Sequence, residues 1–112
     1  MSDVLTALDG HQYRYADEIG LHWALEQAMR AAGLDPQPEH RLPTGRIDFL
    51  VDRVGVEVKV TGSVDTVTRQ LRGYAPFVDE LVLVSTRSRH RQVPREIGGK
   101  PVAVFIVQGA AW

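Results

Sequence analysis

The segment from Arg46 to Val60 constrains the fold of this chain more than any other. Two strand-like runs, Arg46–Val51 and Val56–Val60, stand on either side of the short segment Asp52–Gly55. The second run alternates strictly between valine and a charged residue, as in a β-strand with one buried face. A short turn between two such runs predicts an antiparallel hairpin. The hairpin must therefore carry charged side chains on one face and bury the other.

Side chains alternate across a strand, so the turn fixes which residues share a face. If a four-residue turn pairs Val51 with Val56, then Asp48 lies opposite Lys59, and Leu50 lies opposite Glu57. The charged face then consists of Asp48, Leu50, Glu57 and Lys59. The other face is wholly apolar and consists of Ile47, Phe49, Val51, Val56, Val58 and Val60.

Asp48 and Glu57 are the candidate metal ligands on this hairpin. As diagonal neighbours they lie roughly 7–8 Å apart at the backbone, so their carboxylates could converge on one ion. A hard cation such as Mg²⁺ takes oxygen ligands at about 2.1 Å. The alternative is a solvent-facing ion pair between Asp48 and Lys59 without a metal.

The first long helix is predicted from about Tyr13 to Ala32, and it supplies a third carboxylate. Its apolar stripe at helical spacing is headed by Glu18 and continues through Leu21, Leu25, Ala28 and Ala32. Glu18 is therefore expected to point at the sheet. His22, one turn later, could reach the same ion, although a histidine beside an apolar stripe is more often a packed core residue.

A second helix is predicted to open at Gly62-Ser63 and to end near Pro76, with Ser63 as its N-cap. Gln70 and Tyr74 lie four residues apart and share a face of this helix. Both side chains can contact phosphate or a base edge. The alternative is an ordinary helix surface with one partly buried tyrosine.

The remaining apolar runs complete an α/β fold. A short strand is expected around His40–Leu42, and Leu81–Val84 and Val102–Val107 read as strands buried on both faces. The predicted order is α-β-β-β-α-β followed by a last strand, a mixed central β-sheet flanked by helices. The 112 residues suit a single domain. Residues 1–12 look poorly anchored.

Charge is divided unevenly along the chain. Residues 1–40 contain seven acidic and two basic residues, whereas residues 41–112 contain seven acidic and eleven basic ones. The densest basic stretch contains Arg87, Arg89, Arg91 and Arg95. Such a cluster can neutralise phosphates, so Arg89 and Arg91 are candidate substrate-binding residues. The alternative is a solvated loop.

Composition excludes several other classes of site. The chain has no cysteine, so it forms neither a disulfide nor a thiolate metal site. It shows no signal-peptide pattern, and no apolar run approaches the ~20 residues that span a bilayer. We therefore expect a soluble, cytoplasmic protein that does not contact a membrane.

Together these residues resemble the PD-(D/E)XK nuclease superfamily. The resemblance runs from Glu18 to Val84. It includes Asp48 within GRIDFLV and the E-x-K formed by Glu57, Val58 and Lys59. The following QLRGY resembles the Gln-x-x-x-Tyr motif of RecB-like and phage exonuclease-like members. One departure is that Arg46-Ile47, rather than a proline, precedes the aspartate.

The resemblance implies a restriction-endonuclease-like core, αβββαβ, and hydrolysis of DNA phosphodiester bonds. Mg²⁺ or Mn²⁺ would be held by Asp48, Glu57 and the main-chain carbonyl of Val58, with Glu18 helping directly or through water. Lys59 would orient or help to deprotonate the attacking water. Gln70 and Tyr74 would position the nucleic acid near the metal.

The small size of the chain looks like a phage-type or mobile-element member of that superfamily. The archaeal Holliday-junction resolvases resemble it in size and act as two-fold dimers. A homodimer is therefore an expectation, with Val102–Val107 and Ala110–Trp112 as its candidate interface. The alternatives are a structure-specific resolvase, a non-catalytic nucleic-acid-binding module of the same fold, and a structural or regulatory α/β protein.

Overall fold

In a computed structural model, the described residues 1–107 form an α/β fold of three α-helices and a six-stranded mixed sheet. The helices are α1 (Ser2–Leu8), α2 (Glu18–Ala31) and α3 (Val64–Tyr74). The strands are β1 (Gln37–Leu42), β2 (Gly45–Val51), β3 (Val54–Lys59), β4 (Glu80–Ser85), β5 (Glu96–Ile97) and β6 (Lys100–Ile106). Two 3₁₀ segments, η1 (Ala75–Phe77) and η2 (Ser88–Gln92), precede β4 and β5.

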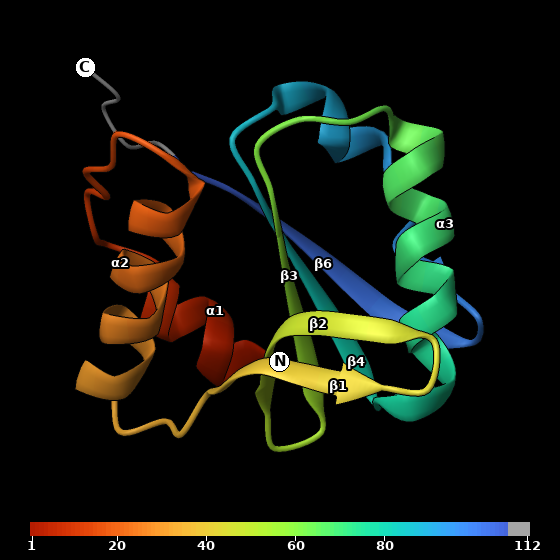
Figure 1. Cartoon of the computed structure of the whole chain (residues 1–112), viewed down its shortest axis with the longest axis horizontal. Coiled ribbons are helices and arrows are strands. Elements are labelled where there is room, and N and C mark those ends of the chain that lie inside the picture. The colour runs from red at the N-terminus through yellow and green to blue at the C-terminus, as the bar shows by residue number, and fades with distance from the viewer. Residues whose placement is uncertain (108–112) are drawn as a thin grey trace.

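The strand order in the sheet is β1-β2-β3-β4-β6-β5. The first three strands are antiparallel neighbours, β3, β4 and β6 are parallel, and β5 pairs antiparallel with β6. Helices α1 and α2 lie on one side of the sheet and α3 on the other (Figure 1). The predicted mixed sheet flanked by helices is therefore confirmed, and so is the order of the main elements.

Two apolar clusters fill the spaces between the sheet and its helices. Phe49, Val56 and Val58 pack with Leu21 and Leu25 on the α1/α2 side. On the α3 side the buried residues include Val67, Leu71, Leu81 and Leu83. Successive residues of β4 belong to opposite clusters, as the alternation of side chains requires, so β4 is packed on both faces. Val54, Val56 and Val58 of β3 all lie in the α1/α2 cluster.

The N-terminal segment is better anchored than the sequence suggested, which corrects the expectation for residues 1–12. Ser2–Leu8 forms a helix whose Val4, Ala7 and Leu8 are buried in the α1/α2 cluster. The Tyr13 hydroxyl donates a hydrogen bond to the Leu8 carbonyl oxygen at 2.5 Å. Seven residues are too few for a stable isolated helix, so its stability comes from packing that no local pattern reveals.

The first long helix begins later than predicted, at Glu18 rather than near Tyr13. Asp17 ends the preceding extended segment and caps the helix, because its Oδ1 accepts a hydrogen bond from the Gly20 N–H at 2.7 Å. Leu21 and Leu25 are buried as expected. Glu18 therefore stands in the first turn, half exposed, and does not head the buried stripe.

The hairpin register also differs from the prediction. Asp52 adopts a left-handed conformation (φ 53°) within a tighter turn, and Val51 pairs with Val54 rather than with Val56. The shift of two residues preserves the faces but brings Asp48 beside Glu57 instead of opposite Lys59. The predicted ion pair between Asp48 and Lys59 is consequently replaced by one between Glu57 and Lys59.

Ile47 lies in the α3-side cluster, although it was predicted to share a face with Phe49 and Val51. The pairing of β2 with β3 stops at Phe49 and Val56, so the first half of β2 separates from β3 while it stays paired with β1. Gly55 makes room for this path, because a Cβ there would meet the Ile47 Cδ1 atom at 2.5 Å. The hairpin is therefore open at the end that carries the carboxylates.

The predicted dimer interface is only partly described. Val102 is buried, whereas residues 103–106 of β6 are half-buried. On the outer edge of β6, β5 pairs with Lys100 and Pro101. Ala110, Ala111 and Trp112 lie outside the described residues. Among the helices of residues 1–107, none combines the length and apolar character needed to cross a membrane.

Candidate active site

Where β2 separates from β3, the backbone hydrogen bonds between the two strands end. Two carboxylates accept hydrogen bonds from backbone N–H groups in their place. The backbone N–H of Asp48 donates to Glu57 Oε1 at 3.2 Å. In return, the backbone N–H of Val58 donates to Asp48 Oδ2 at 2.7 Å. Backbone amides that would otherwise be unpaired are thereby satisfied by side chains. The same bonds hold the two carboxylates at fixed positions at the open end of the hairpin.

Glu57 is almost fully buried, with 2% of its surface exposed. Burial and the neighbouring Asp48 carboxylate raise its pKa from 4.5 to about 8. The Lys59 ammonium, whose Nζ is 3.4 Å from Glu57 Oε2, lowers this pKa but does not cancel the other effects. The three charged groups predicted from the sequence therefore do come together, with Glu57 between Asp48 and Lys59.

His22 of α2 lies against β2, beside Asp48. Its Nε2 lies 3.5 Å from Glu18 Oε2 and 3.9 Å from Asp48 Oδ1, and its ring centroid is 5.9 Å from that of Phe49. Within residues 1–107 this buried nitrogen has no hydrogen-bond partner. Glu18 thus reaches the carboxylate pair through His22 rather than by direct contact.

The donor set fits a hard divalent cation. Asp48 and Glu57 repel one another unless a proton or a cation lies between them, and the Nε2 atom of His22 is buried without a partner beside them. Carboxylate oxygens, a main-chain carbonyl and water are the ligands that Mg²⁺ and Mn²⁺ prefer. In residues 1–107, no group of three or more acidic or histidine side chains forms a ready-made metal cage. The proposed set relies on two carboxylates and the Val58 carbonyl.

Gln70 and Tyr74 form a connected pair on α3. Gln70 Nε2 donates to the Tyr74 hydroxyl at 3.0 Å, and that hydroxyl donates to the Arg46 carbonyl oxygen at 3.0 Å. Tyr74 is 3% exposed, so it offers little surface to a ligand and instead fastens α3 to the start of β2. Gln70 lines the cleft beside the carboxylates. Of the two, only Gln70 is placed to touch a substrate.

Arg87, the N-cap of η2, and Arg89 within it lie over the loop that follows β3. Arg87 Nε donates to the Val60 carbonyl oxygen at 2.7 Å, and Arg89 Nε donates to the Gly62 carbonyl oxygen at 3.1 Å. The buried His90 adds a contact of 2.8 Å between its Nε2 and the same Gly62 oxygen. Arg91 is exposed. The basic segment therefore braces the loop between Lys59 and α3 while remaining at the surface.

The cleft around the carboxylates has a volume of about 330 Å³ and draws residues from both helical layers. Sequence reasoning missed Ile19, Glu39 and Arg46, which line it together with the predicted residues. Glu39 adopts a left-handed conformation (φ 49°), which is strained for a residue other than glycine. No sequence pattern predicts a left-handed glutamate. Ile19, by contrast, lies outside the apolar stripe of its helix, so its exposure was predictable from the helical spacing.

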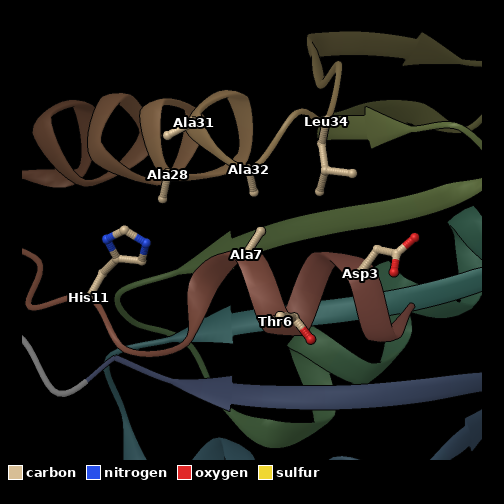
Figure 2. A pocket seen from close by; sticks show the side chains of 8 residues that line it. All are labelled: Asp3, Thr6, Ala7, His11, Ala28, Ala31, Ala32 and Leu34. Carbon is tan, nitrogen blue, oxygen red and sulfur yellow. The ribbon is translucent and has the colours of Figure 1, made fainter.

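A separate hollow of about 540 Å³ lies between α1 and the end of α2 (Figure 2). Its lining includes Ala7, Ala28, Ala31 and Ala32, and it shares no residue with the cleft at Asp48. Its lining also includes Asp3 and His11, but these two ionisable side chains lie at opposite ends of the hollow and do not converge on one point (Figure 2). The carboxylate cleft is therefore the better candidate for chemistry.

Comparisons with protein-family models, with curated proteins and with solved structures give no match for this chain.

Proposed function

We propose that this chain is a metal-dependent nuclease that hydrolyses DNA phosphodiester bonds and is built on a PD-(D/E)XK-type core. The observation that supports this most is the carboxylate pair Asp48 and Glu57 at the open end of the β2–β3 hairpin, with Lys59 Nζ 3.4 Å from Glu57 Oε2. The succession α2, β1, β2, β3, α3, β4 also corresponds to the expected αβββαβ core.

In this proposal Asp48, Glu57 and the main-chain carbonyl of Val58 hold Mg²⁺ or Mn²⁺, and His22 and Glu18 stand at the edge of the site. Such a cation supplies Lewis acidity toward a phosphate oxygen and lowers the pKa of a water molecule. With a pKa of about 8, Glu57 is mostly protonated at neutral pH in the absence of a cation, so a bound cation would take the place of that proton between the two carboxylates.

Lys59 is the candidate for handling the attacking water. Its ammonium lies on the same strand as Glu57 and is partly buried, with 25% of the side chain exposed. A positive charge in a partly desolvated cleft stabilises the negative charge that develops on the phosphate and orients the nucleophile. Gln70, on the neighbouring helix, can donate a hydrogen bond to a phosphate oxygen or a base edge.

The test is cleavage of a panel of linear, nicked, branched and single-stranded DNA by the purified chain with Mg²⁺ or Mn²⁺, and with a chelator as the negative control. Asp48→Asn and Glu57→Gln should lose cleavage. Asp79→Asn is the matched carboxylate control, because Asp79 is 62% exposed and pairs with Arg53 near the β2–β3 turn. Manganese binding measured by calorimetry gives a second readout that does not depend on turnover.

Two outcomes would contradict the proposal in different ways. Binding of DNA without cleavage of any substrate would favour the non-catalytic binding module. Absence of both DNA binding and metal binding would favour a structural or regulatory protein whose charged hairpin is only a surface.

A further inference from the structure

Two large apolar side chains of α2 are left in solvent at the edge of the carboxylate cleft. Ile19 is 80% exposed and Trp23 is 66% exposed, and no other large hydrophobic residue of the described part of the chain is as exposed. They lie four residues apart, which places them one helical turn from each other on the same face of the helix. A tryptophan with this exposure is unusual for a surface that contacts only water.

The exposed pair is continuous with the candidate active site. Trp23, Pro38 and Phe49 line a hollow of about 250 Å³ beside the cleft. This hollow and the carboxylate cleft share four residues, which are Ile19, His22, Glu39 and Asp48. Whatever group occupies the hollow therefore lies next to the carboxylate pair.

Charge divides the mouth of the site into two unlike flanks. The α2 flank carries Glu18 and Glu26 beside the exposed apolar pair, and Glu26 is paired with Arg30 at 2.9 Å. The opposite flank carries Lys59 and Arg46. Phosphates are repelled by the first flank and attracted by the second. An uncharged aromatic base suits the first flank.

We propose that the nuclease acts on unpaired nucleotides, and that a base beside the scissile phosphate stacks on the α2 surface formed by Ile19, Trp23 and Pro38. The phosphates follow the opposite flank past Lys59 and Arg46. This inference rests on the proposed function and adds its substrate class, a single-stranded nucleic acid segment. Bases stack on aromatic side chains with little dependence on sequence, so the preference is for strand state rather than for a base identity.

A duplex and a second copy of the chain both fit this surface less well. Paired bases are stacked inside a duplex, which would present only its phosphates to Glu18 and Glu26. In a two-fold dimer formed through this surface, the carboxylates of Glu18 and Glu26 would face the same carboxylates of the second copy and repel them. Two exposed side chains also fall far short of the roughly 800 Å² per partner that a stable interface buries.

Fluorescence of Trp23 provides a direct test. The chain has two tryptophans, so Trp112→Phe leaves Trp23 as the only reporter. Oligothymidylate, oligouridylate and a blunt DNA hairpin are titrated in Ca²⁺, with cleavage products checked by electrophoresis. We expect both single strands to quench the signal and the hairpin to leave it nearly unchanged. Quenching by only one of the two single strands supports the proposal and identifies DNA or RNA as the ligand.

Variants separate stacking from a structural role. Trp23→Ala should weaken oligothymidylate binding by between about five-fold and a hundred-fold, whereas Trp23→Phe should retain most of the affinity. Gln27→Ala, an exposed residue one turn further along α2, is the matched control and should bind normally. Equal thermal unfolding of all variants checks that each is folded, as the exposure of Trp23 leads us to expect.

Several results would overturn the inference, and they differ from a failure of the proposed function. Equal quenching by hairpin and single strand, or unchanged oligothymidylate affinity in Trp23→Ala, would reject the stacking surface even if the chain cleaves DNA. Light scattering that shows a dimer dissociated by Trp23→Ala would assign the surface to a second copy. Quenching that depends on strand state without cleavage of any substrate would support the stacking surface and reject the nuclease.

Discussion

Asp48 and Glu57 are linked reciprocally across the open end of the β2–β3 hairpin, because each carboxylate accepts a hydrogen bond from a backbone N–H of the other strand. Glu57 Oε1 accepts the Asp48 N–H at 3.2 Å, while Asp48 Oδ2 accepts the Val58 N–H at 2.7 Å. The carboxylates therefore stabilise the hairpin in a way that a simple surface ion pair would not. A substitution at either position should affect both the proposed chemistry and the path of β2.

Isosteric amides separate these two effects at the carboxylate pair. Asp48→Asn and Glu57→Gln retain an oxygen that can accept the backbone N–H, but each removes a negative charge from the proposed metal site. We expect both variants to fold, to lose detectable cleavage, and to bind Mn²⁺ at least about ten-fold more weakly, since losing even a supporting residue costs that much. Calorimetry and a cleavage assay measure the two properties.

Asp79→Asn is the control for both variants and should behave like the unmodified chain, because surface ion pairs contribute little. Full cleavage by purified Asp48→Asn or Glu57→Gln would reject the assignment of the metal ligands. Loss of folding in the amides, with normal folding of Asp79→Asn, would show that the pair is chiefly structural.

The carboxylate pair was predictable although its register was not. Alternation places Glu57 and Lys59 on one face whatever the turn, and a register error of two residues leaves Asp48 on the face that it shares with them. The tighter turn depends on a left-handed Asp52, which the sequence permits but does not require. The prediction thus reached the right residues through an incorrect pairing.

Features that depend on tertiary packing were not predictable. Helix α1 is too short to persist alone, and only its buried Val4 and Leu8 explain it. The separation of β2 from β3, which sends Ile47 to the α3 side, needs the space above Gly55. The left-handed Glu39 is likewise a product of the surrounding structure. A sequence pattern describes one element at a time and carries none of this information.

The stability of the metal-free protein should fall as the pH rises. Glu57 has a pKa of about 8 in the folded chain against its ordinary 4.5, so folding favours the protonated form. Its stabilising contribution is complete below pH 4.5 and is lost as the pH rises through about 8. We expect a loss of a few kcal/mol across this window, seen as a lower midpoint of urea unfolding.

Two comparisons assign this pH dependence. Glu57→Gln has no titrating group at this position and should show a much flatter dependence over the same window. Mg²⁺ should stabilise the unmodified chain more strongly as the pH rises, because the cation replaces a proton that becomes easier to lose. A steep dependence that survives in Glu57→Gln would place its origin at another group.

Lys59 should contribute to the chemical step more than to binding. Lys59→Ala removes the positive charge beside Glu57, and we expect the single-turnover rate to fall by about 10²–10⁴-fold, the range typical of a group that handles a proton. DNA affinity, measured in Ca²⁺, should change little. A large loss of affinity with an unchanged single-turnover rate would instead make Lys59 a phosphate anchor.

Substitution of Tyr74 should lower the stability of the fold, whereas substitution of Gln70 should weaken DNA binding. Tyr74→Phe leaves the Arg46 carbonyl oxygen without its donor, so we expect a loss of about 1–3 kcal/mol in the free energy of unfolding. Gln70→Ala should leave stability nearly unchanged and weaken DNA binding. Urea unfolding and fluorescence anisotropy distinguish the two effects, and the opposite pattern would exchange the roles of the two residues.

The exposed arginines of η2 should bind phosphates without reading sequence. Arg89 and Arg91 lie on the segment that braces the loop after Lys59, so their charges stand beside the flank that the phosphates are proposed to follow. Removing one arginine–phosphate interaction should reduce the slope of log affinity against log salt concentration by about 0.7–0.9. We expect the double substitution Arg89→Ala and Arg91→Ala to weaken binding to all sequences alike and to flatten this slope by about twice that amount.

The control for this experiment is Arg53→Ala in the β2–β3 turn, where Arg53 is 62% exposed and pairs with Asp79. This turn is at the opposite end of the hairpin from the carboxylates, so its charge should not affect the salt slope. Arg89→Lys preserves the charge but removes the Nε donor to Gly62, and it should keep the slope if the phosphate interaction is electrostatic. An unchanged slope in the double variant would identify the segment as a solvated loop whose arginines serve only to brace Gly62 and its neighbours.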